Sequence, residues 1–195
     1  MEFKQGDGFL EMSQSGYIET VLKRFGMENS RPVSTPLVPG LKLQKIDQSE
    51  TGELETFPFR ELIGCLMYLA IGTRPDIAYA VNHLSQFNNT NGKDHWIAAK
   101  RILRYLRGTT KLGLRYEKDS KQLEGFVDSD WGSCPVDRKS YTGLVFILAK
   151  GAITWEARKQ RTVAQSSTEA EYMGLAEAAK EATYLLRFLS EIGYP

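Results

Sequence analysis

The sequence predicts an α+β protein, in which a bundle of three helices is followed by a βββα unit. Two patterns along the chain support this class. Between residues 56 and 108 apolar side chains recur every three or four positions, as on one face of a helix. From Leu123 onwards short apolar runs are separated by turn residues, which is typical of strands. A chain of 195 residues can form one large domain or two small ones.

Residues 1–35 are expected to form a hairpin and a short helix. Residues 1–13 alternate weakly around a Gly-Asp-Gly turn, and residues 14–25 carry apolar side chains at helical spacing. Residues 36–55 are predicted to be a linker without regular structure, because three prolines and a glycine fall within the ten residues that start at Arg31.

Residues 56–118 are predicted to hold three helices and a tether. The first helix carries a continuous apolar stripe and ends at Gly72. Pro75 suits the first turn of the second helix, and the third helix runs from about Asp94 to Arg107. Three short amphipathic helices with short connections indicate a bundle.

Residues 119–195 are predicted to form three strands and one long helix. A Lys-Gly pair between the second and third strands signals a tight hairpin. The expected strands span residues 123–129, 142–149 and 152–158, and the helix spans residues 166–192. Two capping boxes compete at the start of this helix, Ser166 with Glu169 or Thr168 with Glu171.

Asp128 and Glu171 are the candidate catalytic and metal-ligating residues. Aspartate is disfavoured in strands, so Asp128 either ends its strand or binds a hard cation such as Mg²⁺. Glu171 lies in the first turn of the long helix, where an acidic side chain either offsets the helix dipole or binds the same ion. If the helix packs across the sheet, the two carboxylates come close together. A cation between them would relieve their repulsion and could orient a water molecule for attack on a phosphate.

Basic residues are concentrated between residues 93 and 118, a segment that contains eight Lys and Arg residues and only two acidic residues. If the third helix extended to Lys111, part of this set would share one helix face, which is either a solvated surface or a contact for nucleic-acid phosphates. A second basic patch precedes the long helix. The predicted nucleic-acid-binding residues of the two patches are Lys100, Arg101, Arg104, Arg107, Lys111, Arg158, Lys159 and Arg161.

Several classes of protein are disfavoured. Cys65 and Cys134 form no CxxC motif and no disulfide framework. The chain has no apolar run near ~18 residues and no apolar signal core at its start, so we expect a soluble, intracellular protein without membrane contact. It also has no Asp-Asp dipeptide of the kind that polymerase chemistry would require.

Eight motifs in order make the chain resemble the C-terminal part of the Pol polyprotein of copia-type LTR retrotransposons. The motifs are Leu10-Glu-Met-Ser-Gln-Ser-Gly-Tyr17, Pro32-Val-Ser-Thr-Pro36, Leu62-Ile-Gly-Cys-Leu-Met-Tyr68, Thr73-Arg-Pro-Asp-Ile-Ala-Tyr79, Lys100-Arg-Ile-Leu-Arg-Tyr-Leu-Arg-Gly108, Val127-Asp-Ser-Asp-Trp131, Asp137-Arg-Lys-Ser140 and Ser166-Ser-Thr-Glu-Ala-Glu-Tyr172.

This resemblance implies that residues 1–35 are the end of a reverse transcriptase palm and that residues 56–118 hold its thumb-like bundle. Residues 119–195 resemble the first half of a ribonuclease H domain. Asp128 matches the first catalytic aspartate of that family and Glu171 its catalytic glutamate, in a site for two Mg²⁺ ions. The implied partners are an RNA–DNA hybrid or a template–primer duplex, and other Pol segments. The implied location is the cytoplasm, in virus-like particles.

The sequence departs from the family in its missing carboxylates. The polymerase carboxylates and the third and fourth nuclease aspartates have no counterpart here. We therefore expect a truncated segment, ancestrally active in RNA-directed DNA synthesis and in cleavage of RNA in hybrids, that is inactive alone. Two alternatives are a non-catalytic nucleic-acid-binding module and a nuclease completed by another chain. Truncation also predicts an exposed sheet edge and a partly uncovered helix face at Leu175, Ala178, Ala182, Leu186 and Leu189.

Overall fold

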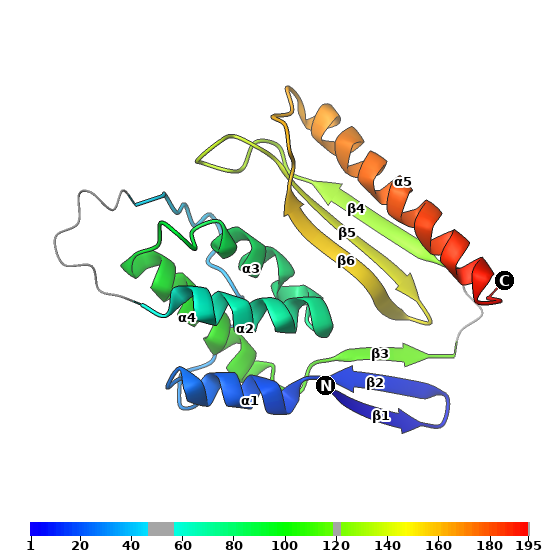
Figure 1. The fold of residues 1–195 in the computed structure, drawn as a ribbon, viewed down its shortest axis with the longest axis horizontal. Coiled ribbons are helices and arrows are strands. Elements are labelled where there is room, and N and C mark those ends of the chain that lie inside the picture. The colour runs from blue at the N-terminus through cyan, green and yellow to red at the C-terminus, as the bar shows by residue number, and fades with distance from the viewer. Residues whose placement is uncertain (47–56, 119–121, 195) are drawn as a thin grey trace. The chain divides into compact units, whose positions relative to one another are not determined.

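The computed structural model describes residues 1–46, 57–118 and 122–194. It divides the chain into two compact units, Met1–Lys118 and Asp119–Pro195, which we call the N-terminal and C-terminal units. The described parts contain five α-helices, one 3₁₀ helix and two antiparallel three-stranded sheets, consistent with the predicted α+β class (Figure 1). Residues 36–46 of the predicted linker form no helix or strand, as expected, and its residues 47–55 lie outside the described residues.

The N-terminal unit contains all the helices predicted for residues 1–118 and one additional strand. Its elements are β1 (Glu2–Gly6), β2 (Phe9–Ser13), α1 (Ser15–Arg24), α2 (Phe59–Gly72), the 3₁₀ helix η1 (Pro75–Ile77), α3 (Ala78–Ser85), α4 (Lys93–Gly108) and β3 (Leu114–Glu117). Ile18 and Leu22 of α1 are buried in the same cluster as Leu66 of α2 and Leu103 of α4. Helix α1 therefore shares one core with the three-helix bundle.

Strand β3 was expected to be part of a tether. It pairs antiparallel with β2, with Leu114 opposite Met12 and Tyr116 opposite Leu10. Gly113 permits this pairing, because a Cβ at this position would overlap the carbonyl oxygen of Met12. The alternation of Leu114 and Tyr116 with polar residues is a strand pattern, but its partner lies about a hundred residues earlier in the chain.

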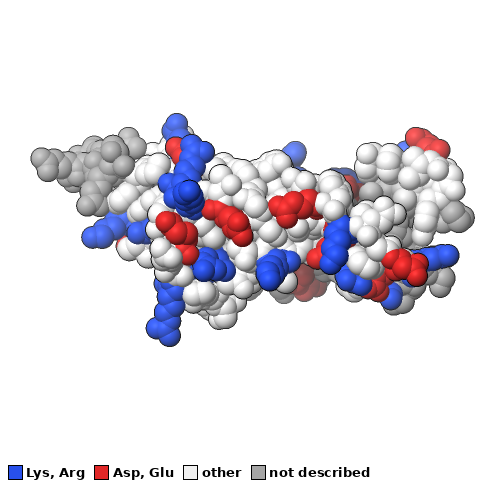
Figure 2. All heavy atoms as spheres, turned by 90° about the horizontal axis from the view of Figure 1, so that it is seen from below, with Lys and Arg blue, Asp and Glu red and all other residues white. Residues whose placement is uncertain are grey.

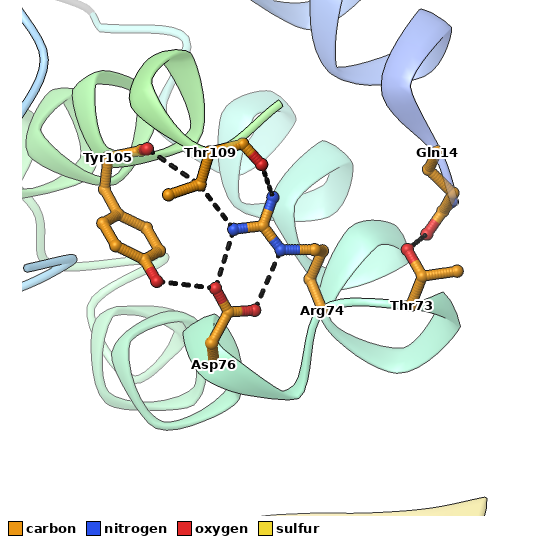
Figure 3. A network of polar contacts seen from close by, with 6 residues as sticks. All are labelled: Gln14, Thr73, Arg74, Asp76, Tyr105 and Thr109. Carbon is orange, nitrogen blue, oxygen red and sulfur yellow. Dashed lines mark hydrogen bonds and ion pairs between the residues drawn. The ribbon is translucent and has the colours of Figure 1, made fainter. Parts of the chain in front are cut away.

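A buried arginine joins η1 to the end of α4 (Figure 3). The side chain of Arg74 is 1% exposed, and its Nε and Nη2 donate hydrogen bonds of 2.9 and 2.7 Å to the two carboxylate oxygens of Asp76. Arg74 also donates to the carbonyl oxygen and the hydroxyl of Thr109, at 3.0 and 2.6 Å. Tyr105 completes the network by donating its hydroxyl to Asp76 at 2.8 Å. The hydrogen bonds from Arg74 therefore hold Thr109, the residue that follows the end of α4, in position.

Asp76 makes the N-terminal unit sensitive to acid. Burial would raise the pKa of Asp76, but the hydrogen bonds and charge of Arg74 and the hydrogen bond from Tyr105 hold it below its ordinary value of 3.8. An acid whose pKa is lowered by folding stabilises the fold above the pKa of the unfolded chain. That contribution is lost as the pH falls through the folded pKa.

We therefore expect the free energy of unfolding of the N-terminal unit to decrease more between about pH 5 and about pH 2.5 in the wild type than in Asp76→Asn, because the variant has no carboxylate to protonate. Urea titrations at the two pH values measure this difference. Asp94→Asn, which removes an exposed acid of α4, should keep the wild-type dependence. An equal decrease in the wild type and Asp76→Asn would show that Asp76 contributes nothing.

The C-terminal unit is a three-stranded sheet covered on one face by a long helix (Figure 1). Strands β4 (Glu124–Ser129), β5 (Tyr141–Leu148) and β6 (Gly151–Lys159) pair in that order, and α5 (Ser167–Glu191) packs against β4 and β5. The small core joins the sheet to the helix and consists of Leu144, Phe146, Ala178 and Leu185. All four elements predicted for this region are confirmed.

The turn between β5 and β6 differs from the prediction. Its two central residues are Ala149 and Lys150, which have positive φ values of 51° and 63°, and not Lys150 and Gly151. Two successive left-handed residues are what a type I′ turn requires, and this turn matches the twist of a hairpin. Gly151 is the first residue of β6.

Strand β4 lies at an edge of the sheet, as expected. The predicted uncovered face of α5 is confirmed at Leu175 and Leu186, which are 55% and 59% exposed, but not at Ala178 and Ala182, which pack in the small core against the sheet. Among the helices that the structure describes, none is both long enough and apolar enough to cross a membrane. Both cysteines are buried and free.

Candidate functional site

The first turn of α5 resolves the two competing capping boxes. Ser166 Oγ accepts a hydrogen bond of 3.1 Å from the backbone N–H of Glu169, and the Glu169 carboxylate accepts one of 2.6 Å from the backbone N–H of Gln165. Ser166 is therefore the N-cap of α5, and Glu169 supports it by binding the backbone N–H of the residue before the cap. The predicted pair of Thr168 with Glu171 does not cap the helix, and the Glu171 side chain is exposed.

Gly174 allows α5 to lie directly on the end of β4. A Cβ on Gly174 would clash with Ser129 Oγ and would lie 3.2 Å from Thr142 Cγ2 and 3.4 Å from Val127 Cγ2. Ser129 and Thr142 are themselves joined by a hydrogen bond of 2.9 Å between their hydroxyls. Since Gly174 lies one helical turn after Glu171, this close contact also fixes the position of Glu171 over the sheet.

Gln160 is a supporting residue that the sequence did not indicate. Its side chain is buried, and its Nε2 donates hydrogen bonds of 2.9 Å to Thr142 Oγ1 and of 2.9 Å to the carbonyl oxygen of Ala170. The amide therefore ties the end of β6 to β5 and to the first turn of α5. No pattern in the sequence marks a glutamine after a strand as such a tie.

Asp128 and Glu171 line one hollow of about 450 Å³ in the C-terminal unit. Val127 and Ser129 of β4 and three residues of α5, Thr168, Tyr172 and Leu175, complete its lining. The structure thus brings the two predicted site residues together, although they lie on different elements. By contrast, Asp130 accepts a hydrogen bond of 2.9 Å from the backbone N–H of Tyr141 and forms part of the turn after β4.

The donor chemistry of this hollow suits a hard divalent cation. Carboxylate oxygens are preferred ligands of Mg²⁺, and Asp128 and Glu171 would hold the ion. Across residues 1–46, 57–118 and 122–194, no group of three or more His, Cys, Asp and Glu side chains is arranged to hold a metal ion. Asp128 and Glu171 are thus the two acidic side chains that line this hollow.

The basic stripe of α4 ends close to the predicted end of the helix. The helix ends at Gly108, so Lys111 lies beyond it and does not share the face of Lys100, Arg104 and Arg107. The hydrogen bonds from Arg74 to Thr109 hold the chain where the helix stops. The predicted end of the helix, near Arg107, is thus confirmed, and the condition that would have placed Lys111 on the same face is not met.

Three arginines of α4 hold the segment of residues 28–43, which we call the strap. Arg107 Nε donates to the carbonyl oxygen of Glu28 at 2.7 Å, and Arg104 Nε donates to the carbonyl oxygen of Arg31 at 2.8 Å. Arg101 donates to the hydroxyl of Thr35 at 2.9 Å. All three acceptors are neutral oxygen atoms, so the positive charges of these arginines are not compensated by these contacts. The Lys100 ammonium lies 5.8 Å from the centre of the Trp96 ring.

The second basic patch is paired with acids instead. Arg158 forms ion pairs with Glu177 at 2.8 Å and with Glu156 at 3.3 Å, and Lys159 forms one with Asp137 at 2.8 Å. Burial would raise the pKa of Asp137, but the hydrogen bond from Lys159 outweighs it and, with hydrogen bonds from Cys134 and Lys139, lowers the pKa to about 2.

Arg161 is exposed. On the face of the molecule shown in Figure 2, Lys and Arg side chains are interspersed with Asp and Glu side chains. In the patch before α5, Arg158 and Lys159 form ion pairs with acids, whereas the hydrogen bonds of the three α4 arginines go to neutral oxygen atoms.

Comparison with known proteins connects both units to one family. The chain is 46% identical over 188 residues to the retrovirus-related Pol polyprotein from transposon TNT 1-94 of Nicotiana tabacum, a match that covers 94% of this chain and 14% of that protein. It is 39% identical over 194 residues to the Pol polyprotein from transposon RE1 of Arabidopsis thaliana, covering 99% of this chain and 13% of that protein. The chain belongs to the copia-type retrovirus-related Pol family.

This Pol-family chain thus spans about one seventh of the length of the transposon polyproteins that it matches. An uncharacterised mitochondrial protein of Arabidopsis thaliana is closer in extent, with 40% identity over 185 residues that cover 94% of this chain and 75% of that protein. No family model and no solved structure matches the chain.

Proposed function

We propose that the C-terminal unit supplies two ligands, Asp128 and Glu171, to the Mg²⁺ site of a ribonuclease H that cleaves RNA in RNA–DNA hybrids. The observation that supports this proposal is the hollow that both carboxylates line, at the point where α5 lies directly on β4. A bound Mg²⁺ would supply an oriented water molecule and stabilise charge on the scissile phosphate.

The residues of this unit prepare the site before any ion binds. Gly174 and Gln160 hold the start of α5 against the sheet, and the Ser166 cap leaves Glu171 uninvolved in the helix start. Two carboxylates that share a hollow repel each other, so a cation between them gains binding energy from relieving that repulsion. Because the backbone holds both carboxylates in place before the ion binds, little reorganisation is needed when a divalent cation enters.

We further propose that this chain alone does not catalyse the cleavage of RNA in a hybrid. A two-metal nuclease site is built from about four carboxylates, and two ligands would leave a second ion without a cage. Incubating the 195-residue chain with a labelled RNA–DNA hybrid in Mg²⁺ or Mn²⁺ tests this. We expect no cleavage above the rate of an Asp128→Asn control. Cleavage at an enzymatic rate that disappears in Asp128→Asn would contradict the incomplete site while supporting the metal ligands.

We propose that the N-terminal unit contacts the backbone of a template–primer duplex as part of a reverse transcriptase thumb. The support is the charge of Lys100, Arg101, Arg104 and Arg107 on α4. The hydrogen bonds that the three arginines donate to the strap go to neutral oxygen atoms. Such contacts give a binding constant that falls with salt and depends little on sequence. This observation also favours the second candidate function, a binding module without catalysis.

Salt dependence separates the two basic patches. Lys100→Gln removes a cation that does not hold the strap, so it should reduce the slope of log K against log[salt] for a hybrid by about 1. Arg158→Gln is the matched control, because Arg158 is paired with Glu177 and Glu156. Fluorescence anisotropy with a labelled hybrid measures both slopes. Equal reductions would contradict the assignment to α4, and binding without any salt dependence would remove the proposed contact.

A further inference from the structure

A second hollow, separate from the candidate metal site, lies between the strap and α4 in the N-terminal unit. Its volume is about 450 Å³, which is within the range of about 300–1,000 Å³ typical of small-molecule sites. Its floor and walls are mainly apolar and are formed by Met27, Val38, Leu41, Leu43, Ile97 and Ala98. Its polar lining consists of Lys42, Asp94, Lys100, Arg101 and Arg104.

The strap is anchored on both sides of this hollow. The arginine contacts fix it as far as Thr35, and Leu43 is buried in the core with 3% exposure. Between these anchors the chain crosses α4 without regular structure and leaves Val38 46% exposed and Ile97 53% exposed. Two large apolar side chains thus face solvent inside a concavity whose backbone is held in place.

The polar lining of the hollow favours an anion. Four of its side chains are cations and one, Asp94, is an acid. The Nε–H of Arg101 is buried and has no hydrogen-bond acceptor among the residues that the structure describes. A buried donor without an acceptor costs free energy, so an anion that reached the Arg101 guanidinium would relieve that cost.

We propose that this hollow is a binding site for a small amphipathic anion, a medium-chain alkyl carboxylate. The alkyl chain lies on Val38 and Ile97 and removes their apolar surface from water. The carboxylate lies among Lys42, Lys100 and Arg101. The negative charge of Asp94 repels the carboxylate of the ligand. Removing that charge therefore tests whether the carboxylate binds in this hollow. This proposal does not rest on the ribonuclease H or reverse transcriptase proposals, although Lys100 and Arg101 also belong to the proposed duplex contact.

Isothermal titration of the full chain with decanoate below its micelle concentration tests the proposal. We expect saturable binding of one decanoate, with clearly weaker binding of decan-1-ol and of decyltrimethylammonium. Lys42→Met should weaken decanoate binding by about two- to fivefold and Asp94→Asn should tighten it by a similar factor, the range expected for partly exposed charges. Lys111→Met changes a cation outside the hollow and should leave the Kd unchanged.

Three results would overturn the site. One is equal affinity for decanoate and decan-1-ol, which would indicate apolar partitioning only. The second is an Asp94→Asn variant that binds no more tightly than the wild type. The third is equal weakening by Lys42→Met and Lys111→Met, which would indicate attraction to the overall charge. Neither lysine holds the strap in the contacts described above, so both variants should fold.

Discussion

Replacing Arg74 with methionine should lower the free energy of unfolding of the N-terminal unit by about 3–5 kcal/mol, the range for breaking a buried ion pair by removing one partner. The side chain of Arg74 is 1% exposed, and it contacts Asp76, both oxygens of Thr109, and the ring of Tyr105, whose centre lies 5.7 Å from the guanidinium carbon. Methionine keeps the unbranched apolar part of the side chain but removes the guanidinium, so the Thr109 carbonyl loses its Arg74 donor and the Asp76 carboxylate is left with the hydrogen bond from Tyr105.

Urea unfolding of the full chain, followed through amide resonances of α2 and α4, measures this loss. Arg74→Lys keeps the charge but loses the planar fork that binds two acceptors, so it should retain only part of the stability. Arg115→Met removes an exposed ion pair with Glu117, and its effect should stay below about 1 kcal/mol. Equal decreases in the free energy of unfolding for Arg74→Met and Arg115→Met would show that the buried network stabilises the unit no more than an exposed ion pair does.

Replacing Gly174 with valine should destabilise the C-terminal unit by about 1–3 kcal/mol, the usual cost of overpacking. The new side chain would meet Ser129, Thr142 and Val127, which belong to the sheet beneath α5. The helix must then move away from β4 near Glu171. The same change should therefore widen the hollow that Asp128 and Glu171 share and weaken any cation bound between them.

Gly64 of α2 provides a matched control for this prediction. It is an exposed helical glycine with no atom within 4 Å of a Cβ built on it. Gly64→Val should change stability by no more than about 0.5 kcal/mol, because valine and glycine differ little in helix propensity and nothing is displaced. Thermal unfolding of both variants compares the sites. A Gly174→Val variant as stable as the wild type would contradict the close contact of α5 with β4.

Local periodicity predicted most of the fold. Helices α2 and α5 and strands β4 to β6 each carry a pattern that their own residues determine, and each appears within a few residues of its expected bounds. Contacts between distant segments were not predictable in this way. The pairing of β3 with β2 and the hydrogen bonds from Arg74 that end α4 at Gly108 join segments with no shared sequence signal.

In the candidate site, too, the local features were predictable from the sequence and the contacts between distant segments were not. Asp128 and Glu171 were identifiable as acids at a strand end and a helix start, but their proximity depends on Gly174 and Gln160. In the sequence Gly174 indicates only a weakened helix, and Gln160 indicates nothing. The arginines of α4 were predicted to face solvent or phosphate, whereas all three donate hydrogen bonds to the strap, because a guanidinium group can also bind carbonyl and hydroxyl oxygens.

The most direct test of this account is a titration of the isotopically labelled full chain with Mn²⁺, observed by paramagnetic broadening of amide resonances. We predict one weak site, with broadening centred on Asp128 and Glu171, that Mg²⁺ displaces and that both Asp128→Asn and Glu171→Gln abolish. Asp130→Asn, which changes an acid that instead binds the backbone N–H of Tyr141, should leave the broadening in place. Broadening centred elsewhere, or unchanged in Asp128→Asn, would contradict a shared metal site of these two carboxylates.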